Sequence, residues 1–143
     1  MLKFSLSNSL FGDLSSSFEL KQSKMINIKT NYKYILSLIY KNSIINNLIV
    51  DQILCNGDMN DSSFILLDAG DSTKQLSINN INVSNSESNG SFIKLIGKGS
   101  ELSIQDSNFK NIISYGPVIE NQSNMVILQY IYITINRFFF WKN

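Results

Sequence analysis

The stretch LSINNINVSN, from Leu76 to Asn85, returns twenty-six residues later as LSIQDSNFKN, from Leu102 to Asn111. Both segments place apolar residues at matching positions and fill the gaps with small polar residues. An internal repeat at this period is typical of proteins built from stacked, similar coils. The repeat is therefore the first guide to the fold.

Two further segments of the chain fit the same register. The steps between the starts of the four segments are 33, 26 and 24 residues. Aligned, the segments form three columns: Ile45, Ile78, Ile104 and Leu128; Leu48, Ile81, Ser107 and Ile131; and Val50, Val83, Phe109 and Ile133. Only Ser107 is polar. We expect these columns to line the interior, with one loop of variable length between segments.

The spacing inside each segment indicates a bent strand. Ile78 and Ile81 are three residues apart, whereas Ile81 and Val83 are two apart, and a period of two is that of a strand. A strand that turns a corner at Asn80 and then resumes explains both spacings. Asn and Asp tolerate the left-handed conformation that such a corner needs. The corner column holds Asn47, Asn80, Asp106 and Tyr130, of which only Tyr130 does not fit.

A second apolar run precedes each of the last three segments. These runs are SFILLD (63–68), SFIKLI (91–96) and GPVIEN (116–121). The polar stretches SNSESNG (84–90) and GKGSE (97–101) are typical of loops. We predict one coil to be strand, short turn, strand, Asn corner, strand and longer loop.

This layout resembles the right-handed parallel β-helix of the pectate-lyase-like superfamily, whose three-stranded coils carry an asparagine corner. The resemblance covers residues 43–136 and implies an all-β chain of about four to five coils. Residues 1–42 would be degenerate coils or a cap, and residues 137–143 a tail or the edge of a longer protein. The leucine-rich repeat does not fit, because Ser77, Asn80 and Asn82 occupy its apolar sites. Another β-solenoid or a sandwich remains an alternative.

The composition supports strands and excludes several functions. The 143 residues contain 21 Ile but one Ala, so the chain has little from which to build helices. Twelve Lys and Arg against 11 Asp and Glu form no basic stripe, which argues against a nucleic-acid partner. With no His, every His-based triad and metal site is excluded. Cys55 is the only cysteine, so an intrachain disulfide is excluded as well.

The termini show no clear targeting or membrane signal. The first residues, MLKFSLSNSLFGDL, lack the continuous apolar core of a signal peptide. The apolar stretch 125–141 contains Gln129, Asn136 and Arg137, whereas a spanning helix needs about 20 residues with few or no charges. We therefore expect no membrane span. An extracellular or cell-surface location is the expectation that the resemblance carries.

The strand stack 63–68, 91–96 and 116–121 is where the resemblance implies working residues. Its outward column would hold Leu66, Lys94 and Glu120 if Ile65, Ile93 and Ile119 point inward. A pectate lyase would need acidic calcium ligands and a base, and a polygalacturonase would need clustered aspartates. Neither set is in the stack, and Arg137 is the only arginine. We expect Lys94 and Glu120 to form a surface ion pair between adjacent coils.

Other residues capable of chemistry favour structural roles. Asp58, Asp61, Asp68 and Asp71 have the density of a Ca²⁺ site but not the spacing of a calcium loop, so solvated turns are expected. The sequons at Asn60, Asn82, Asn89 and Asn121 match the number expected by chance. Asn47 and Asn80 are expected to hydrogen-bond along the corner rather than bind a ligand. Cys55 has no cation beside it in sequence that would activate its thiol.

These observations predict a non-enzymatic β-helix with a structural or adhesive role. No catalytic, cofactor-binding or metal-binding residue is predicted, and no cofactor. A polysaccharide or a protein is the expected partner, and the oligomeric state stays open. The alternatives are a truncated or degenerate polysaccharide-active enzyme, lyase or glycoside hydrolase, and an intracellular solenoid scaffold.

Overall fold

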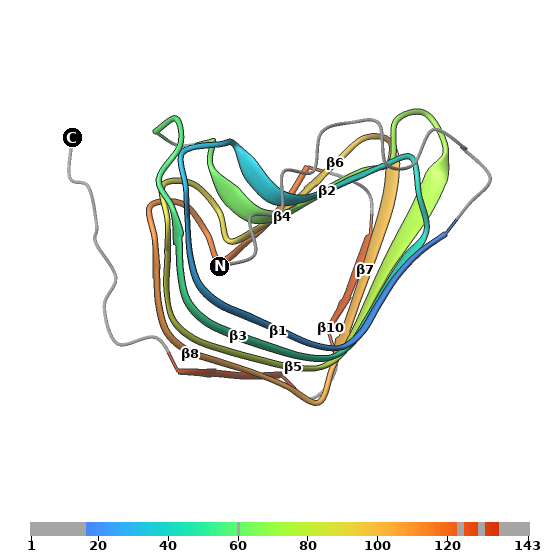
Figure 1. The fold of residues 1–143 in the computed structure, drawn as a ribbon. Coiled ribbons are helices and arrows are strands. Elements are labelled where there is room, and N and C mark those ends of the chain that lie inside the picture. The colour runs from blue at the N-terminus through green and yellow to red at the C-terminus, as the bar shows by residue number, and fades with distance from the viewer. Residues whose placement is uncertain (1–16, 60, 123–124, 129–130, 135–143) are drawn as a thin grey trace.

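The computed structural model describes residues 17–59, 61–122, 125–128 and 131–134. They form a parallel β-solenoid of about four turns, with no helix among the described residues (Figure 1). The expectation of an all-β chain of stacked coils is confirmed. The strands are β1 (Phe18–Thr30), β2 (Tyr34–Ile39), β3 (Ser43–Cys55), β4 (Ser63–Asp68), β5 (Thr73–Ser88), β6 (Ile93–Ile96), β7 (Gly99–Gln105), β8 (Ser107–Ser114), β9 (Ile119–Asn121), β10 (Met125–Leu128) and β11 (Ile131–Thr134).

Two parallel sheets make up the wall of the solenoid. The seven-stranded sheet runs β1-β3-β5-β7-β10, with β8 pairing with β5 and β11 with β8. The four-stranded sheet runs β2-β4-β6-β9. Figure 1 looks along the stack, with β1, β3, β5 and β8 superposed on one side and β2, β4 and β6 on the opposite side. The first three coils therefore contribute a long bent strand to one sheet, which in the later coils is divided into β7 and β8 and into β10 and β11, and the short strands form the other sheet.

The strand register is the one that the sequence columns predict. Ile45 pairs with Ile78, Ile78 with Ile104, and Ile104 with Leu128. Ile45, Ile78 and Ile104 are at most 1% exposed. Burying one such side chain contributes about 1.5–3 kcal/mol, and each coil covers the apolar side chains of the next.

The predicted corner is present, and its residues have left-handed backbone conformations. The φ angles are 56° at Asn47, 55° at Asn80 and 47° at Asp106, and Tyr130 lies outside the described residues. A second corner follows five residues later in each of these coils. It is formed by Gln52 (φ 55°), Asn85 (47°) and Asn111 (54°), and the pattern of apolar residues did not predict it.

The second corner corrects the assignment of the stretch 84–90. We expected SNSESNG to be a loop, but β5 continues through it to Ser88 and bends at Asn85. Ser86 and Ser88 point inward and are at most 2% exposed. Similarly, the last three residues of GKGSE (97–101) belong to β7. Small polar residues resemble a loop in sequence, yet inside a solenoid corner they can remain in a strand.

Two buried serines accept hydrogen bonds from backbone amides at the corners of the preceding coil. The hydroxyl of Ser107 donates to the carbonyl of Gln105 at 2.6 Å and accepts from the Ile81 amide at 3.2 Å. At the second corner Ser86 donates to the Ser84 carbonyl at 2.7 Å and accepts from the Ile53 amide at 3.2 Å. Buried amides rarely lack a partner. The one polar residue in the predicted apolar columns, Ser107, is therefore there to satisfy an amide of the preceding coil.

The sequence left the register of residues 1–42 open, and the structure defines it from Phe18 onward. Strand β1 lies in register with β3, with Leu20 opposite Ile45 and Met25 opposite Val50. Its two corners are at Gln22 and Asn27, again five residues apart. Residues 18–39 therefore form a coil of the same plan as the later ones.

Candidate functional site

The outer face of the four-stranded sheet carries the column that the resemblance marks as a working surface. Leu66 lies opposite Lys94, and Lys94 opposite Glu120. Ile65 and Ile93 of the neighbouring column are fully buried, as expected. The predicted ion pair is present, with 4.0 Å between Lys94 Nζ and Glu120 Oε2. Leu66 is only 5% exposed, so the outer face is partly covered there.

A third coil joins this pair through Asp61, which sequence reasoning did not connect to Lys94. Asp61 lies in the turn before β4, and its Oδ1 accepts from Lys94 Nζ at 3.1 Å and from the Tyr34 hydroxyl at 3.3 Å. Its Oδ2 accepts from Lys33 Nζ at 2.7 Å. We call Lys33, Tyr34, Asp61, Lys94 and Glu120 the outer cluster. It connects four coils on the outside of the sheet.

Three groups of the outer cluster, Tyr34, Asp61 and Lys94, have pKa values shifted so that they keep their ordinary charge states. The Lys33 hydrogen bond lowers the pKa of Asp61, an effect that burial opposes and that Lys94 reinforces. Burial alone would lower the pKa of Lys94, but the hydrogen bond to Asp61 and the charge of Glu120 outweigh it and raise that pKa. Burial also raises the pKa of Tyr34. A general acid or base near neutral pH needs the opposite shifts.

The four aspartates with calcium-like density are distributed over two turns. Asp58 and Asp61 precede β4, whereas Asp68 ends it and Asp71 follows it. Asp68 Oδ1 accepts from the Gly70 amide at 2.9 Å, and Asp71 accepts from Lys98 at 2.7 Å. No group of three or more His, Cys, Asp or Glu side chains is placed to hold a metal within the described part of the chain.

The corner asparagines form ladders along the stack. Asn80 Nδ2 donates to Asn47 Oδ1 at 2.6 Å, the arrangement expected from the sequence. At the second corner Asn111 donates to Asn85 at 3.0 Å, and Asn85 donates to the Asp51 carboxylate at 2.9 Å. The hydrogen bonds from Ser84 and Asn85 lower the pKa of Asp51. These side-chain amides form hydrogen bonds with neighbouring side chains at the corners, which gives them a structural role.

The remaining residues with potential chemistry are Cys55, the sequon asparagines and Arg137. Cys55 is fully buried, and burial raises the pKa of its thiol to about 12, so the reactive thiolate is suppressed. Among the sequons, Asn82 is exposed, whereas Asn89 donates to Asn56 at 3.1 Å and to the Gly57 carbonyl at 3.0 Å. Asn121 is exposed, and Asn60 and Arg137 lie outside the described residues.

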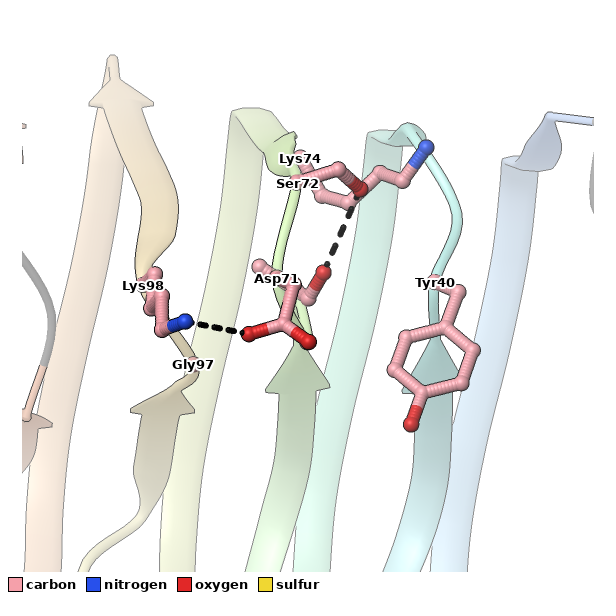
Figure 2. A pocket seen from close by; sticks show the side chains of 8 residues that line it. Tyr40, Asp71, Ser72, Lys74, Gly97 and Lys98 are labelled. Atoms are coloured by element: carbon pink, nitrogen blue, oxygen red, sulfur yellow. Dashed lines mark hydrogen bonds and ion pairs between the residues drawn. The ribbon is translucent and has the colours of Figure 1, made fainter.

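A hollow of about 600 Å³ opens where the four-stranded sheet turns into the seven-stranded one (Figure 2). It is lined by Tyr40, Ala69, Gly70, Asp71, Ser72, Lys74, Gly97 and Lys98. Lys74 lies near the start of β5, and the other seven residues belong to three stacked turns, 40–42, 69–72 and 97–98. Tyr40 has φ 57°, a conformation that costs a bulky side chain about 1–2 kcal/mol. Sequence reasoning missed this hollow, because an aromatic residue in a sequence does not indicate a turn position with positive φ.

The comparisons with known proteins add no assignment. No protein-family model matches the chain, and no curated protein or solved structure is significantly similar to it. The parallel β-solenoid therefore stands on the strand register, and the pectate-lyase-like superfamily remains a prediction.

None of the residues that the structure describes forms a helix long and apolar enough to cross a membrane.

Proposed function

We propose that this chain is a non-enzymatic β-helix module of the right-handed, pectate-lyase-like kind, with a structural or adhesive role at a cell surface or outside the cell. The strand plan with left-handed Asn corners supports the assignment to that kind of coil. The polar side chains on the outside of the coils support the proposed function.

The outer cluster is the observation that carries this proposal. Its face is where a polysaccharide-cleaving relative would place an acid and a base, but here Asp61, Lys94 and Glu120 bind one another. Lys94 is 14% exposed and its ammonium lies between two carboxylates. Asp61 is held as a carboxylate and Lys94 as an ammonium, so neither group is poised for proton transfer. The arrangement stabilises the stack of coils and leaves its flat sides for contact with a partner.

An assay for cleavage tests the proposal directly. The chain is incubated with pectin and with other plant and bacterial polysaccharides, and the release of reducing ends or unsaturated uronides is measured. We expect no release above the level of a matched Lys94→Met, Asp61→Asn double variant. Release by the unaltered chain that the double variant lacks would overturn the proposal in favour of a polysaccharide-active enzyme.

Binding measurements test the adhesive role. We expect the chain to bind a glycan or a protein of the cell surface, and variants of one exposed face to lose that binding. Exposed Asn79 near the corner serves as the matched control, because Asn79→Ala changes the surface but no left-handed position. Binding that is insensitive to all surface variants would contradict a specific contact face.

A further inference from the structure

The hollow beside Tyr40 differs from every other corner of the described chain in the residue that it uses. The other non-glycine residues with positive φ are Asn, Asp and Gln, whereas Tyr40 is aromatic. The next coils place glycines in the stacked turns, with φ 61° at Gly70 and 94° at Gly97. A residue that disfavours its own conformation and stays outside the core is a mark of function rather than of folding. Tyr40 is 42% exposed, so its ring does not compensate by joining the core.

Gly70 is shaped to receive the Tyr40 ring. A Cβ atom at Gly70 would lie 2.4 Å from Cε1 of Tyr40, so the ring rests directly on the glycine backbone. A Cβ atom at Gly97 would lie 2.6 Å from the Gly70 amide nitrogen, so the third turn also approaches closely. The ring is supported by backbone and remains open to solvent elsewhere. It therefore forms a fixed apolar platform at the wall of the hollow.

Polar groups that exchange partners easily surround this platform. Figure 2 shows Asp71 between Tyr40 and Lys98. The ion pair of Asp71 and Lys98 spans 2.7 Å, but the two side chains are 88% and 79% exposed. Such an exposed pair is weak, so a ligand hydroxyl can replace either partner at little cost. Lys74 adds a second positive charge, and Ser72 adds a hydroxyl that donates to the Ala69 carbonyl at 3.5 Å.

We propose that the hollow lined by Tyr40, Asp71, Lys74 and Lys98 is a binding subsite for a pyranose sugar ring. This inference rests on the proposed adhesive function and names the ligand class and the place of contact. A pyranose presents an apolar C–H face and a rim of hydroxyls, which match an aromatic platform beside paired charges. The subsite lies at a turn of the solenoid, away from the outer cluster.

The surplus of positive charge gives the subsite a preference among sugars. Lys74, Lys98 and Asp71 are the charged residues that line the hollow, so it carries one more positive than negative group. A carboxylate on the sugar ring therefore gains a charge-assisted hydrogen bond that a neutral ring lacks. We expect acidic pyranoses to bind more tightly than neutral ones.

Titration calorimetry of the full chain with two probes tests the subsite. The probes are a hyaluronate hexasaccharide, which alternates acidic and neutral rings, and maltohexaose, which is neutral. The test variant is Tyr40→Asn, because Asn suits the left-handed position and the substitution preserves the fold. We expect both affinities to fall by about tenfold or more when the platform is removed. Lys74→Gln should weaken binding of hyaluronate only.

The control is Tyr115→Asn, which removes a tyrosine of similar exposure, 47%, from a different turn. It should leave both affinities unchanged, and thermal melts should show that all variants remain folded. Equal affinities of the Tyr40→Asn variant and the unaltered chain would overturn the subsite. So would failure of the unaltered chain to bind either probe, although an adhesive role with another partner would stand. Release of reducing ends would instead overturn the proposed function.

Discussion

Different kinds of interaction join successive coils in the two sheets. In the seven-stranded sheet the corners recur five residues apart in four coils. Corner side-chain amides bond to equivalent side chains one coil away, and two buried serine hydroxyls accept from backbone amides of the preceding coil. In the four-stranded sheet the turns differ from coil to coil, and apart from the pair Lys94 and Glu120 the outer cluster joins residues that are not equivalent. Repetition therefore marks the part of the coil that specifies the fold. Irregular turns are where a solenoid can acquire a function, because changes there leave the strand register intact.

The largest effect is expected from a charge placed inside the regular part. Ile78→Asp should unfold the domain, because Ile78 is 1% exposed and an unpaired carboxylate between two coils has no compensating partner. Asn82→Asp, on the outer face of the same strand, should leave the melting temperature nearly unchanged. Circular dichroism melts of both variants measure this difference. Similar losses in both would show that the assigned register is wrong.

Removal of one buried hydroxyl tests how far the corners depend on serine. Ser107→Ala should lower the free energy of unfolding by about 1–3 kcal/mol, because the Ile81 amide loses its acceptor inside the corner. Ser103→Ala is the matched control on the adjacent strand, where the residue pairs with Ser77 and is only partly buried. Urea titrations give both values. An equal change in the two variants would contradict the role assigned to Ser107.

The corner conformation gives a smaller, separable effect. Asn80→Ala should destabilise the fold by about 1–2 kcal/mol, because alanine disfavours φ 55°. Asn80→Gly should recover part of this loss, since it restores the conformation but not the hydrogen bond to Asn47. The comparison of the two variants in urea titrations separates strain from the amide ladder. If glycine is as destabilising as alanine, conformation is not the reason for Asn at the corner.

The smallest effect is expected in the irregular sheet, and it depends on pH. Because the pKa of Asp61 is lowered on folding, its contribution is present above the ordinary value of 3.8 and is lost as the pH falls through the folded pKa. Asp61→Asn should therefore cost less than about 1 kcal/mol at pH 7 and nothing further in strong acid. Melts from pH 7 down to pH 2 measure this, with Asp71→Asn as an exposed control. A loss at pH 7 as large as that of Ser107→Ala would contradict the contrast between the sheets.

The regular sheet was predictable from the sequence because its apolar residues follow strict periods. The columns through Ile78, Ile81 and Val83 gave the register, and Asn80 marked the first corner. The second corner at Asn85 was missed, because Ser86 and Ser88 are polar and yet point inward. Their hydroxyls donate to backbone carbonyls near the bend, so both polar side chains can be buried. The five-residue spacing of Asn80 and Asn85, repeated by Asp106 and Asn111, was the signal available in the sequence.

The candidate sites were predictable only where the register alone determines neighbours. Lys94 and Glu120 lie in one column, so their pairing was expected and is present. Asp61 comes from an irregular turn, and nothing in the strand period gives the direction of its side chain. The hollow at Tyr40 likewise depends on three turns of different length. Turn geometry is set by particular backbone angles and contacts, which periodicity does not encode.

The amide ladders all point the same way. In each, the side-chain N–H of a later coil donates to an oxygen of the coil before it, as Asn80 does to Asn47 and Asn111 to Asn85. The side-chain dipoles therefore add along the axis, with the positive end toward the first coil. In one ladder Asp51 places its negative charge at that end, as an acidic residue does at the start of an α-helix. A solenoid with no helix among its described residues thus has a direction along its axis, which its side-chain amides set.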